Sequence, residues 1–370
     1  MSWIAWHNPT LARGTDTKYV DALAETAPTI MAAGLFGDCR SHYSVFGPEA
    51  PDGPSECRRM NPAVPMPFPP RHSPVAPREY AVPSVAEIRE MTGSNGLVVA
   101  STFAGAGGSS TGYRWAGYDV RYANEYLDDA ADCYRANWPT THLDRRDARS
   151  VSGADILEAC GVDDLDILDG SPPCQPFSMA GRREHNWNRT YEHGDGTVNA
   201  GGSEDLVHEW LRLVEEVRPR AAVMENVRGL AVGKAKGYLV RVLDDLRSAG
   251  YRAGAKLLDA QYLGTPQRRV RVYIVAVRDD LERDPVFPRP QRSRYTVADA
   301  CPWLRDTDQH ADSPPNPRKL TILEVKRLSG FPDDYALVGN YAEQWARLGN
   351  SVPPPMARAV GLALLPVLRR

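Results

Sequence analysis

The fold class is set by residues Gly96–Gly108, which read GLVVASTFAGAGG. The residues up to Thr102 form a short apolar run behind a glycine, which predicts a buried strand. The glycine-rich stretch Phe103–Gly108 follows directly. Such a turn lets the backbone approach a ligand closely, and the helix after it offers unpaired N–H groups. A tight turn without a ligand explains these glycines nearly as well, so the motif needs support from elsewhere in the chain.

Further strands and helices are expected downstream. Residues 204–217 carry apolar side chains at helical spacing, and residues 238–248 do the same. Strands alternating with helices are typical of an α/β protein, here with a doubly wound, parallel sheet. The four strands expected after the first are Asp119–Asn124, Asp164–Asp169, Ala221–Met224 and Arg269–Val277.

The overall composition sets limits on compartment and partners. The net charge of −3 gives no hint of nucleic acid, although a chain of this kind can still be locally basic. The six cysteines form no Cys-x-x-Cys pair, so we expect no metal site. We find no secretory segment near the N-terminus and no uninterrupted run of about 18 apolar residues. We therefore expect a cytoplasmic protein with reduced thiols and no membrane partner.

The first 95 residues differ from the rest of the chain. Prolines recur between Pro48 and Pro83, and proline lacks an amide donor and fixes φ. This stretch is predicted to be an extended linker or a loop-rich lobe. At its end, Ser84 and Glu87 have the spacing of a capping box and predict a helix over Val85–Met91.

Two groups capable of chemistry follow the third and fourth strands. Cys174 stands in SPPCQPFS (Ser171–Ser178), a proline-stiffened turn at the edge where open α/β sheets bind ligands. A reactive thiol explains this setting better than an inert cysteine, which would normally lie within a strand or helix face. Glu225 ends the fourth strand and can share that pocket. Taken alone, Glu225 is better explained as an N-cap acid for the next helix.

Polar residues also gather at the other strand ends. Gln267, Arg269 and Arg271 alternate along the start of the fifth strand and would share one face, which suits an anionic or carbonyl-bearing ligand. A solvated strand end is the equal alternative. Glu125 ends the second strand, where an acid can bond ribose hydroxyls. Asp147 could serve an adenine, or be a surface acid among its arginine neighbours.

Helix signals recur near the C-terminus. Thr321 and Glu324 predict a capping box at the start of a helix, and residues 354–368 predict a final helix. The sequence GNSVP, which contains Asn350 and Val352, precedes that helix and by itself is explained as helix punctuation.

The order of these segments resembles the motif series of the DNA cytosine-5 methyltransferases. The likeness covers 96–278 and 318–370. It implies a Rossmann-like methyltransferase sheet with a small, irregular DNA-recognition lobe, and S-adenosylmethionine as cofactor. The motifs are Phe-x-Gly-x-Gly-Gly at 103–108, Pro-Cys-Gln at 173–175, Glu-Asn-Val at 225–227, Gln-x-Arg-x-Arg at 267–271, Arg-x-Leu-Thr…Gly-Phe-Pro at 318–332 and Gly-Asn-Ser-Val at 349–352.

The resemblance assigns roles to individual residues. Cys174 would add to C6 of a cytosine flipped out of the duplex, because C5 alone is a poor nucleophile. Glu225 would hydrogen-bond ring atom N3, and Arg269 and Arg271 would hold the cytosine carbonyl and order the catalytic loop. The base that removes the C5 proton is left unassigned. The expected cofactor positions are Phe103, Gly105, Gly107, Gly108, Glu125, Asp147, Pro173, Leu206, Asn350 and Val352; those expected at the DNA or in the closing loop 178–203 are Gln175, Ser178, Arg182, Arg183 and Gln267.

The chain departs from the family pattern in its recognition region. Only 279–317 lies where the family usually carries a sizeable target-recognition region, so we expect a short recognition and hinge segment there. The sequence Ala27-Pro28-Thr29-Ile30 resembles a recognition element, which suggests that residues 1–80 supply the missing lobe. Phosphate contacts are better expected from 265–295, with eight arginines against four acids. The expected units are 1–95 (atypical N-terminal region with a proline-rich linker), 96–278 (catalytic and cofactor-binding) and 318–370 (completing both lobes).

The resemblance also implies partners. We expect a bacterial or phage protein that acts as a monomer on double-stranded DNA, with a cognate restriction enzyme as one further partner. Two alternatives stay open. One is an enzyme of the same fold that acts on tRNA cytosine, and the other is an inactive binding protein that retains the fold.

Overall fold

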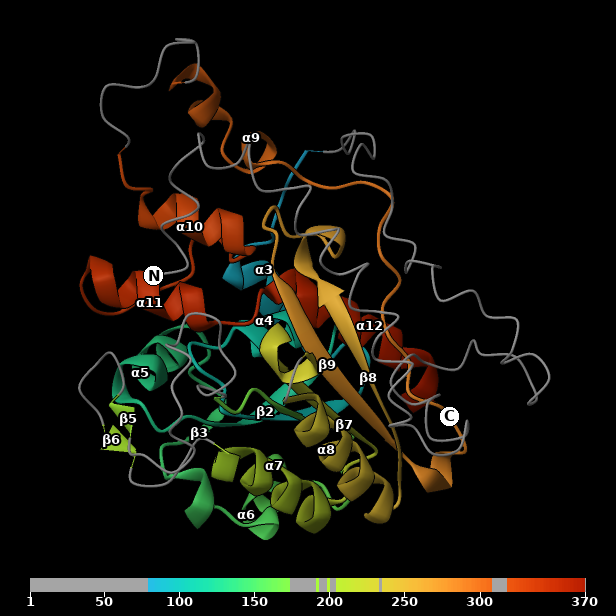
Figure 1. The fold of residues 1–370 in the computed structure, drawn as a ribbon. Helices are drawn as coiled ribbons and strands as arrows, with labels where there is room; N and C mark the ends of the chain where they lie inside the picture. Colours follow the sequence, from blue (N-terminus) through green and yellow to red (C-terminus); the bar gives the residue numbers. More distant parts are fainter. Residues whose placement is uncertain are drawn as a thin grey trace, which may run out of the picture.

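A mixed seven-stranded sheet forms the centre of the part of the chain that the structure describes (Figure 1). The computed structural model describes residues 79–173, 191–192, 198–199, 204–232, 235–307 and 318–369. The strand order is β3-β2-β1-β4-β7-β9-β8. The strands are β1 (Val98–Thr102), β2 (Asp119–Asn124), β3 (His142–Asp144), β4 (Ile167–Gly170), β7 (Ala221–Val227), β8 (Tyr251–Asp259) and β9 (Val270–Arg278); β5 (Tyr191–Glu192) and β6 (Val198–Asn199) form a separate antiparallel pair.

The expected parallel sheet is wrong at one strand. β1 pairs in parallel with β2 and β4, and β4 with β7. In contrast, β9 runs antiparallel to both β7 and β8. The reason is the connection: β8 and β9 are joined by the short segment 260–269, which is too short for the helical crossover that a parallel pair needs. The α/β class is confirmed, and the antiparallel strand fits into the sheet between β7 and β8.

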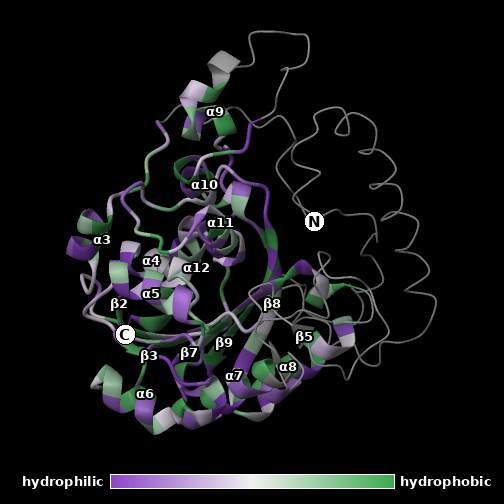
Figure 2. Cartoon of the chain, turned by 90° about the vertical axis from the view of Figure 1, so that its left-hand side faces the viewer, coloured by the Kyte–Doolittle hydropathy of each residue, from purple (hydrophilic) through white to green (hydrophobic). Residues whose placement is uncertain are grey.

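Helices cover both faces of the sheet. On one face lie α6 (Gly153–Cys160), α7 (Glu204–Val217) and α8 (Lys236–Ser248), with the fully buried Trp210 of α7 in their core. On the other face lie α4 (Gly108–Trp115) and α12 (Pro354–Leu368) (Figure 1). The central strands β1 and β7 are buried at every residue except Val227, because helices cover both of their faces. Outer helices such as α6 and α8 carry apolar and polar residues together (Figure 2).

The predicted helices agree with the structure in place and capping. The helix over 204–217 is confirmed as α7, and α8 extends two residues before the predicted start at 238. Ser84 and Glu87 form a full capping box at α3 (Val85–Met91), as do Thr321 and Glu324 at α10 (Ile322–Ser329). No prediction covered α5 (Asp128–Asn137), β3 or β8.

A smaller helical unit stands at one end of the sheet. It contains α9 (Val297–Ala300), a 3-10 helix over Pro302–Thr307, α10 and α11 (Tyr341–Asn350) (Figure 1). Its apolar residues Val325, Phe331, Tyr335 and Leu348 pack with Tyr134 of α5 in one buried cluster. Its elements come from the segments 279–317 and 318–370, where the sequence predicted the small lobe.

The C-terminal residues Tyr341–Leu368 contain a stretch long and apolar enough to cross a membrane by length and composition alone. However, 61% of that stretch is buried inside the protein. The chain also leaves the helical conformation between α11 and α12. The apolar character of this segment is therefore that of a core helix, α12, packed on α4.

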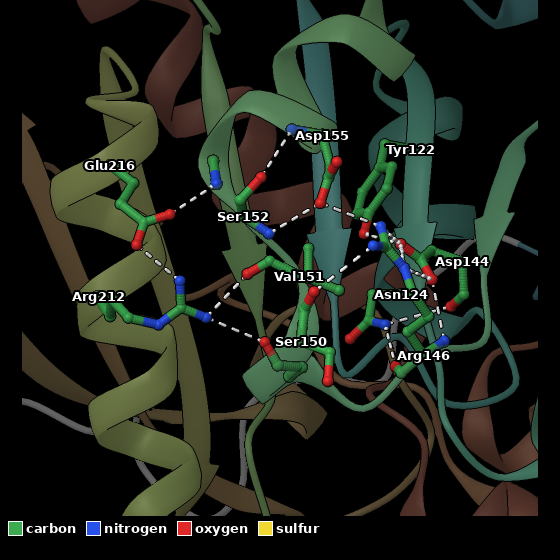
Figure 3. Close-up of polar contacts among 12 residues, drawn as sticks. Tyr122, Asn124, Asp144, Arg146, Ser150, Val151, Ser152, Asp155, Arg212 and Glu216 are labelled. Atoms are coloured by element: carbon green, nitrogen blue, oxygen red, sulfur yellow. Dashed lines mark hydrogen bonds and ion pairs between the residues drawn. The ribbon is translucent and has the colours of Figure 1, made fainter.

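A polar network fixes the loop after β3 against α7 (Figure 3). Arg212 of α7 donates to the carbonyls of Ala148 and Val151 at 3.0 and 2.9 Å. On the other side of the loop, Arg146 bonds Asp144 at 2.7 Å and Asp155 at 3.2 Å. The loop carries Asp147, so these contacts hold one of the predicted cofactor residues in place.

Candidate active site

The glycine-rich turn lies between β1 and α4 at the carboxyl edge of the sheet. Phe103 adopts a positive φ of 51° and Gly105 one of 56°. A side chain at Gly105 would meet nothing within 4 Å, so the space beside this backbone is open to a ligand. At Gly108 the opposite holds: a Cβ there would lie 2.1 Å from the carbonyl oxygen of Val352. Thus Gly108 is required for the turn to contact the segment before α12.

Glu125 lies at the turn, as predicted from its place after β2. It is buried, and its carboxylate accepts hydrogen bonds from the backbone N–H of Gly105 at 2.7 Å and of Leu127 at 2.9 Å. Burial raises the pKa of Glu125, and these N–H donors oppose the rise. The carboxylate therefore stands beside the open space at Gly105, where it can accept from ribose hydroxyls.

The remaining predicted cofactor residues fall into two groups. Leu206 and Val352 are buried, and Val352 contacts Gly108 of the glycine-rich turn. Asp147 is half-exposed and pairs with Arg149 at 2.9 Å, so it has a salt-bridge partner in this structure. Asn350 ends α11 and is exposed.

The predicted nucleophile, Cys174, lies outside the described residues, as do Gln175, Ser178, Arg182 and Arg183. The structure describes the chain up to Pro173. Asn226 of β7 donates from Nδ2 to the carbonyl oxygen of Pro172 at 3.1 Å, and is itself buried. Pro172 therefore joins the segment entering Cys174 to the residue next to Glu225.

Glu225 lies within β7 with its side chain 11% exposed, and does not cap a helix. Val227 takes the cap position of the following 3-10 helix, so the N-cap interpretation of Glu225 is wrong. Arg271 of β9 places its Nε 3.1 Å from Glu225 Oε1. That oxygen makes no hydrogen bond to any described residue, so the contact is an ion pair without aligned hydrogen-bond geometry. A carboxyl and a guanidinium thus meet at the edge of the sheet beside the segment that leads to Cys174.

Arg269 has a different position from the one expected of a substrate-binding group. It donates from Nη1 to the carbonyl of Gly349 at 2.7 Å and from Nη2 to the carbonyl of Ser351 at 2.9 Å. Burial, together with the nearby charge of Arg271, lowers the pKa of Arg269 to about 10. Arg269 therefore fixes the segment before α12, and only Arg271 reaches Glu225 directly.

Buried polar atoms without partners gather at this edge. Within the described part of the chain, none of the following makes a hydrogen bond: Ser171 Oγ, Glu225 Oε1, Gln267 Oε1 and Arg269 Nε. Leaving one such buried group unsatisfied costs about 1–3 kcal/mol, so native proteins usually provide a partner. With the open space at Gly105 and the carboxylate of Glu125, these atoms fit a site that binds a nucleoside-like cofactor and a polar base.

The cysteines in the described part of the chain are poor nucleophiles. Cys133, Cys160 and Cys301 are all buried and reduced. Burial raises the pKa of Cys160 to about 12 and of Cys301 to about 11, and it also raises that of Cys133. Since the thiolate is the reactive form, none of the three suits covalent chemistry near neutral pH.

Three residues of the site were missed in the sequence. Asn226 follows Glu225 in the Glu-Asn-Val motif, and that adjacency was the one available signal. Asp169 of β4 and Tyr273 of β9 lie on the sheet face that carries Glu225, and their sequence context is that of ordinary strand residues. The Gly-Phe-Pro motif also contributes, because Phe331 and Tyr335 contact the glycine-rich turn.

A family model describes almost all of the region outlined above. The model for C-5 cytosine-specific DNA methylases matches residues 97–306 and 286–365. Among relatives, the type II methyltransferase M1.HphI of Haemophilus parahaemolyticus is 27% identical over 335 residues, covering 73% of this chain and 87% of its own. M.XorII of Xanthomonas oryzae pv. oryzae is 32% identical over 238 residues, covering 63% of this chain and 51% of its own.

Solved structures show the same fold. A protein described as a DNA modification methyltransferase encoded within an E. coli prophage superposes with a TM-score of 0.59 at 21% identity, over 74% of this chain and all of that one. The S. pombe Dnmt2 methyltransferase gives a TM-score of 0.52 at 18% identity, over 73% and 98%. Together with the family match, the strand order and the glycine-rich turn beside Glu125, these comparisons show that the chain belongs to the C-5 cytosine-specific DNA methylases, as a DNA (cytosine-5-)-methyltransferase that uses S-adenosylmethionine.

Proposed function

We propose that the methyl group reaches C5 of a cytosine turned out of duplex DNA, through a covalent bond between Cys174 and ring atom C6. The observation that carries this proposal is the hydrogen bond between Asn226 and Pro172, beside the Glu225–Arg271 pair. It joins the strand end bearing the proposed acid to the segment that enters the proposed nucleophile. A base paired inside a duplex cannot reach such a pocket, so it must be flipped at a cost of a few kcal/mol.

The proposed reaction has three steps, which are addition of the thiolate, methyl transfer and elimination. The Cys174 thiolate forms a C–S bond to C6, and the C5–C6 π electrons move into the ring, which makes C5 nucleophilic. Bound S-adenosylmethionine would supply the methyl group from its sulfonium centre, and the S–CH3 bond would break to leave S-adenosylhomocysteine. After C5 takes the methyl group, loss of its proton to a base and cleavage of the C–S bond restore the aromatic ring and the thiolate.

The neighbouring side chains lower the energy of the addition. Glu225 would donate a hydrogen bond to N3, where negative charge develops as the thiolate adds. Arg271 would orient Glu225 and stabilise charge on the adjacent carbonyl oxygen, since its Nε already lies 3.1 Å from the carboxylate. Arg269 would act through the segment at 349–351, which it holds by two hydrogen bonds. Gln267, with a buried and unsatisfied Oε1, would contact the DNA or the closing loop.

Covalent trapping tests the proposal. DNA containing 5-fluorocytosine blocks the final elimination, so the wild-type chain should remain attached to it after methyl transfer. Cys174→Ser should give no adduct, and Glu225→Gln should give at least tenfold less. Cys160→Ala is the matched control: it removes a thiol that burial keeps protonated, and should trap as the wild type does. Trapping by Cys174→Ser, or loss of trapping in properly folded Cys160→Ala alone, would overturn the assignment.

We propose that phosphate contacts come from the basic segment 265–295 and from the loop residues Arg182 and Arg183. In this segment Arg278 forms ion pairs with Asp164 and Asp280. In contrast, Arg268, Arg289 and Arg292 are exposed. Exposed arginines near the site suit the DNA backbone, whose contacts make binding salt-dependent. Replacing Arg289 and Arg292 together by Gln should lower the salt dependence of DNA binding by about two charges. An unchanged salt slope would contradict this role.

We also propose that residues 1–80 provide target recognition, because the family match begins at 97 and only 279–317 occupies the usual recognition position. Deleting residues 1–80 should abolish sequence-specific DNA binding and preserve S-adenosylmethionine binding. Unchanged specific methylation would exclude the idea. The names of the bacterial relatives further support a cytoplasmic, type II modification role with a cognate restriction enzyme, which restriction digestion of DNA from expressing cells can test.

A further inference from the structure

An aromatic contact fixes the beginning of the described chain to the small lobe, the helical unit of α9, α10 and α11. The ring of Tyr80 packs edge-to-face on Tyr295, with 4.9 Å between the ring centroids. The Tyr80 hydroxyl donates to the carbonyl oxygen of Arg327 at 2.9 Å, across 247 residues of sequence. The same ring packs on a buried cluster that contains Ala300, Cys301 and Leu328. Tyr80 therefore joins the N-terminal part of the chain to two separate segments of the lobe.

The partner of the Tyr80 hydroxyl is itself held from several sides. Arg327 pairs with Asp333, donates from Nη1 to the carbonyl of Ala300 at 3.2 Å, and lies over the ring of Trp303 at 4.8 Å. Burial raises the pKa of Tyr80 well above its usual value, so its hydroxyl stays protonated and remains a donor. A tyrosine that combines a packed ring with one directed hydrogen bond fixes both the position and the orientation of its backbone.

A second attachment follows five residues later. The backbone N–H of Val85 donates to both carboxylate oxygens of Asp334, at 3.0 and 3.1 Å. Ile88 of α3 is fully buried in the cluster that joins α5 to the lobe. Figure 1 shows the segment before α3 running towards α9. The chain before Tyr80 thus starts from the lobe, beside Tyr295.

This starting point coincides with the place where the chain departs from its family. The family model begins at residue 97, so Tyr80 and all residues before it lie outside the matched region. Tyr295 lies in 279–317, the short segment that stands where the recognition region was expected. The Tyr80 contact therefore brings the additional N-terminal region to the part of the lobe where recognition sequence is short.

The lobe is in turn fixed to the glycine-rich turn. Phe331 follows Arg327 by four residues, and its ring would lie 3.1 Å from a Cβ at Gly108. The Tyr335 hydroxyl donates to the carbonyl of Ala106. A region held on the lobe by Tyr80 is therefore also held at a defined place relative to the cofactor turn.

We propose that Tyr80 is a positioning residue for target recognition, which holds residues 1–79 on the small lobe through Tyr295 and Arg327. The inference rests on the proposed function, because this anchor matters only if residues 1–80 read the target sequence. A region that is already held in place loses less conformational freedom when DNA binds than a region on a free tether. The anchor therefore increases both the affinity for DNA and the discrimination between sites.

Bisulfite sequencing of duplex DNA methylated by the full chain tests the proposal. The cytosines that the wild type methylates fastest define the target, and the ratio of target to other-site methylation is the readout. Tyr80→Ala should lower this ratio about tenfold, because it removes the aromatic pair and the hydrogen bond together. Its KM for DNA should rise, while kcat at saturating DNA stays within about twofold of wild type. Tyr80→Phe keeps the ring and should lower the ratio by only about twofold to threefold.

Tyr118→Phe is the matched control for the hydroxyl. The Tyr118 hydroxyl donates to the carbonyl of Gly361 at 2.8 Å, also across a long stretch of sequence, but in the core between α4 and α12. Its loss should leave the ratio at the wild-type value. If Tyr80→Ala does not fold, Tyr295→Ala removes the partner ring instead and should lower the ratio in the same direction as Tyr80→Phe.

A Tyr80 that only stabilises the fold would lower kcat through loss of folded enzyme, with the ratio and the KM for DNA unchanged. That result, or an equal fall of the ratio in Tyr118→Phe and Tyr80→Phe, would overturn the role of Tyr80. Specific methylation that survives deletion of residues 1–80 would instead overturn the recognition role of the N-terminal region, and the anchor with it.

Discussion

Asp169→Asn should stabilise the protein more at alkaline pH than in acid, because it removes the charge of a buried carboxylate. Burial raises the pKa of Asp169 from 3.8 to about 6, so the folded state binds this proton more tightly than the unfolded chain does. A group of this kind costs nothing below pH 3.8, and its full cost applies above about pH 6. A shift of about two units corresponds to about 3 kcal/mol at pH 8, and linkage gives about 1 kcal/mol at pH 4.5. Asparagine is neutral at every pH and avoids this cost.

Urea unfolding of wild type and variant at pH 4.5 and pH 8 measures the difference. The exchange of hydrogen-bond partners adds an offset that is constant with pH, so the change between the two pH values is the quantity to compare. We expect the variant to gain about 2 kcal/mol relative to wild type on going from pH 4.5 to pH 8. If the difference in free energy of unfolding between variant and wild type is the same at both pH values, the charge of Asp169 does not destabilise the fold. That result would refute the reasoning about its burial.

Asp166→Asn is the control with the opposite expected sign. Asp166 lies close to Asp169 in sequence, but it pairs with the buried Arg220, with 2.5 Å between Nη1 and Oδ1. Removing its charge leaves a buried guanidinium without its counter-ion, which costs about 3–5 kcal/mol. One buried acidic residue thus stabilises the fold through its ion pair, whereas the charge of the other destabilises it.

Three further predictions concern the turn, the segment before α12 and the small lobe. Gly108→Ala should lower the affinity for S-adenosylmethionine at least tenfold in calorimetry, because the new Cβ would lie 2.1 Å from the carbonyl oxygen of Val352. Gly237→Ala is the control and should bind normally, because a Cβ at Gly237 meets no atom within 4 Å. Arg269→Lys should lose about 1–3 kcal/mol in urea unfolding, since one ammonium cannot serve the carbonyls of both Gly349 and Ser351; wild-type stability would contradict that bridging role. Arg318 holds the pKa of Glu324 down to about 2. The stabilisation of the fold by this ion pair is therefore complete above pH 4.5, and it is lost as the pH falls towards 2. Glu324→Gln should therefore cost about 1–3 kcal/mol at pH 7 and progressively less in acid, and a cost that stays constant in acid would exclude the pair as its source.

Local sequence predicted the elements whose signals are local. β1, β2, α7 and α12 were located because their apolar runs or helical spacing are uninterrupted. β8 was missed because Arg252 and Lys256 interrupt its apolar pattern at an edge strand where polar residues are tolerated. β3 has only three residues, too few for any periodicity to show. The direction of β9 depends on the length of the connection from β8, and a strand's own residues do not record it.

The site was predicted from motif order, while its connections were not. Glu225 and Arg271 were both assigned to one pocket, and the structure brings them to 3.1 Å. The alternation of Gln267, Arg269 and Arg271 also suggested one shared role. Arg269 instead binds carbonyls about eighty residues away in the chain, and Arg271 turns to β7. Contacts at such separation depend on how the sheet and α12 pack, which no local pattern contains.

The glycine-rich turn and Arg269 both contact the segment that precedes α12. The glycine-rich turn opens the catalytic region, yet Gly108 contacts Val352 and Arg269 holds Gly349 and Ser351. We therefore expect the turn to take this shape only when α12 has docked on α4. A cofactor that binds only the docked form stabilises this docking by mass action. At a free cofactor concentration of one hundred times the Kd, the stabilisation is about 2.7 kcal/mol. If the turn binds the cofactor as proposed, α12 contributes to that site through the backbone that precedes it.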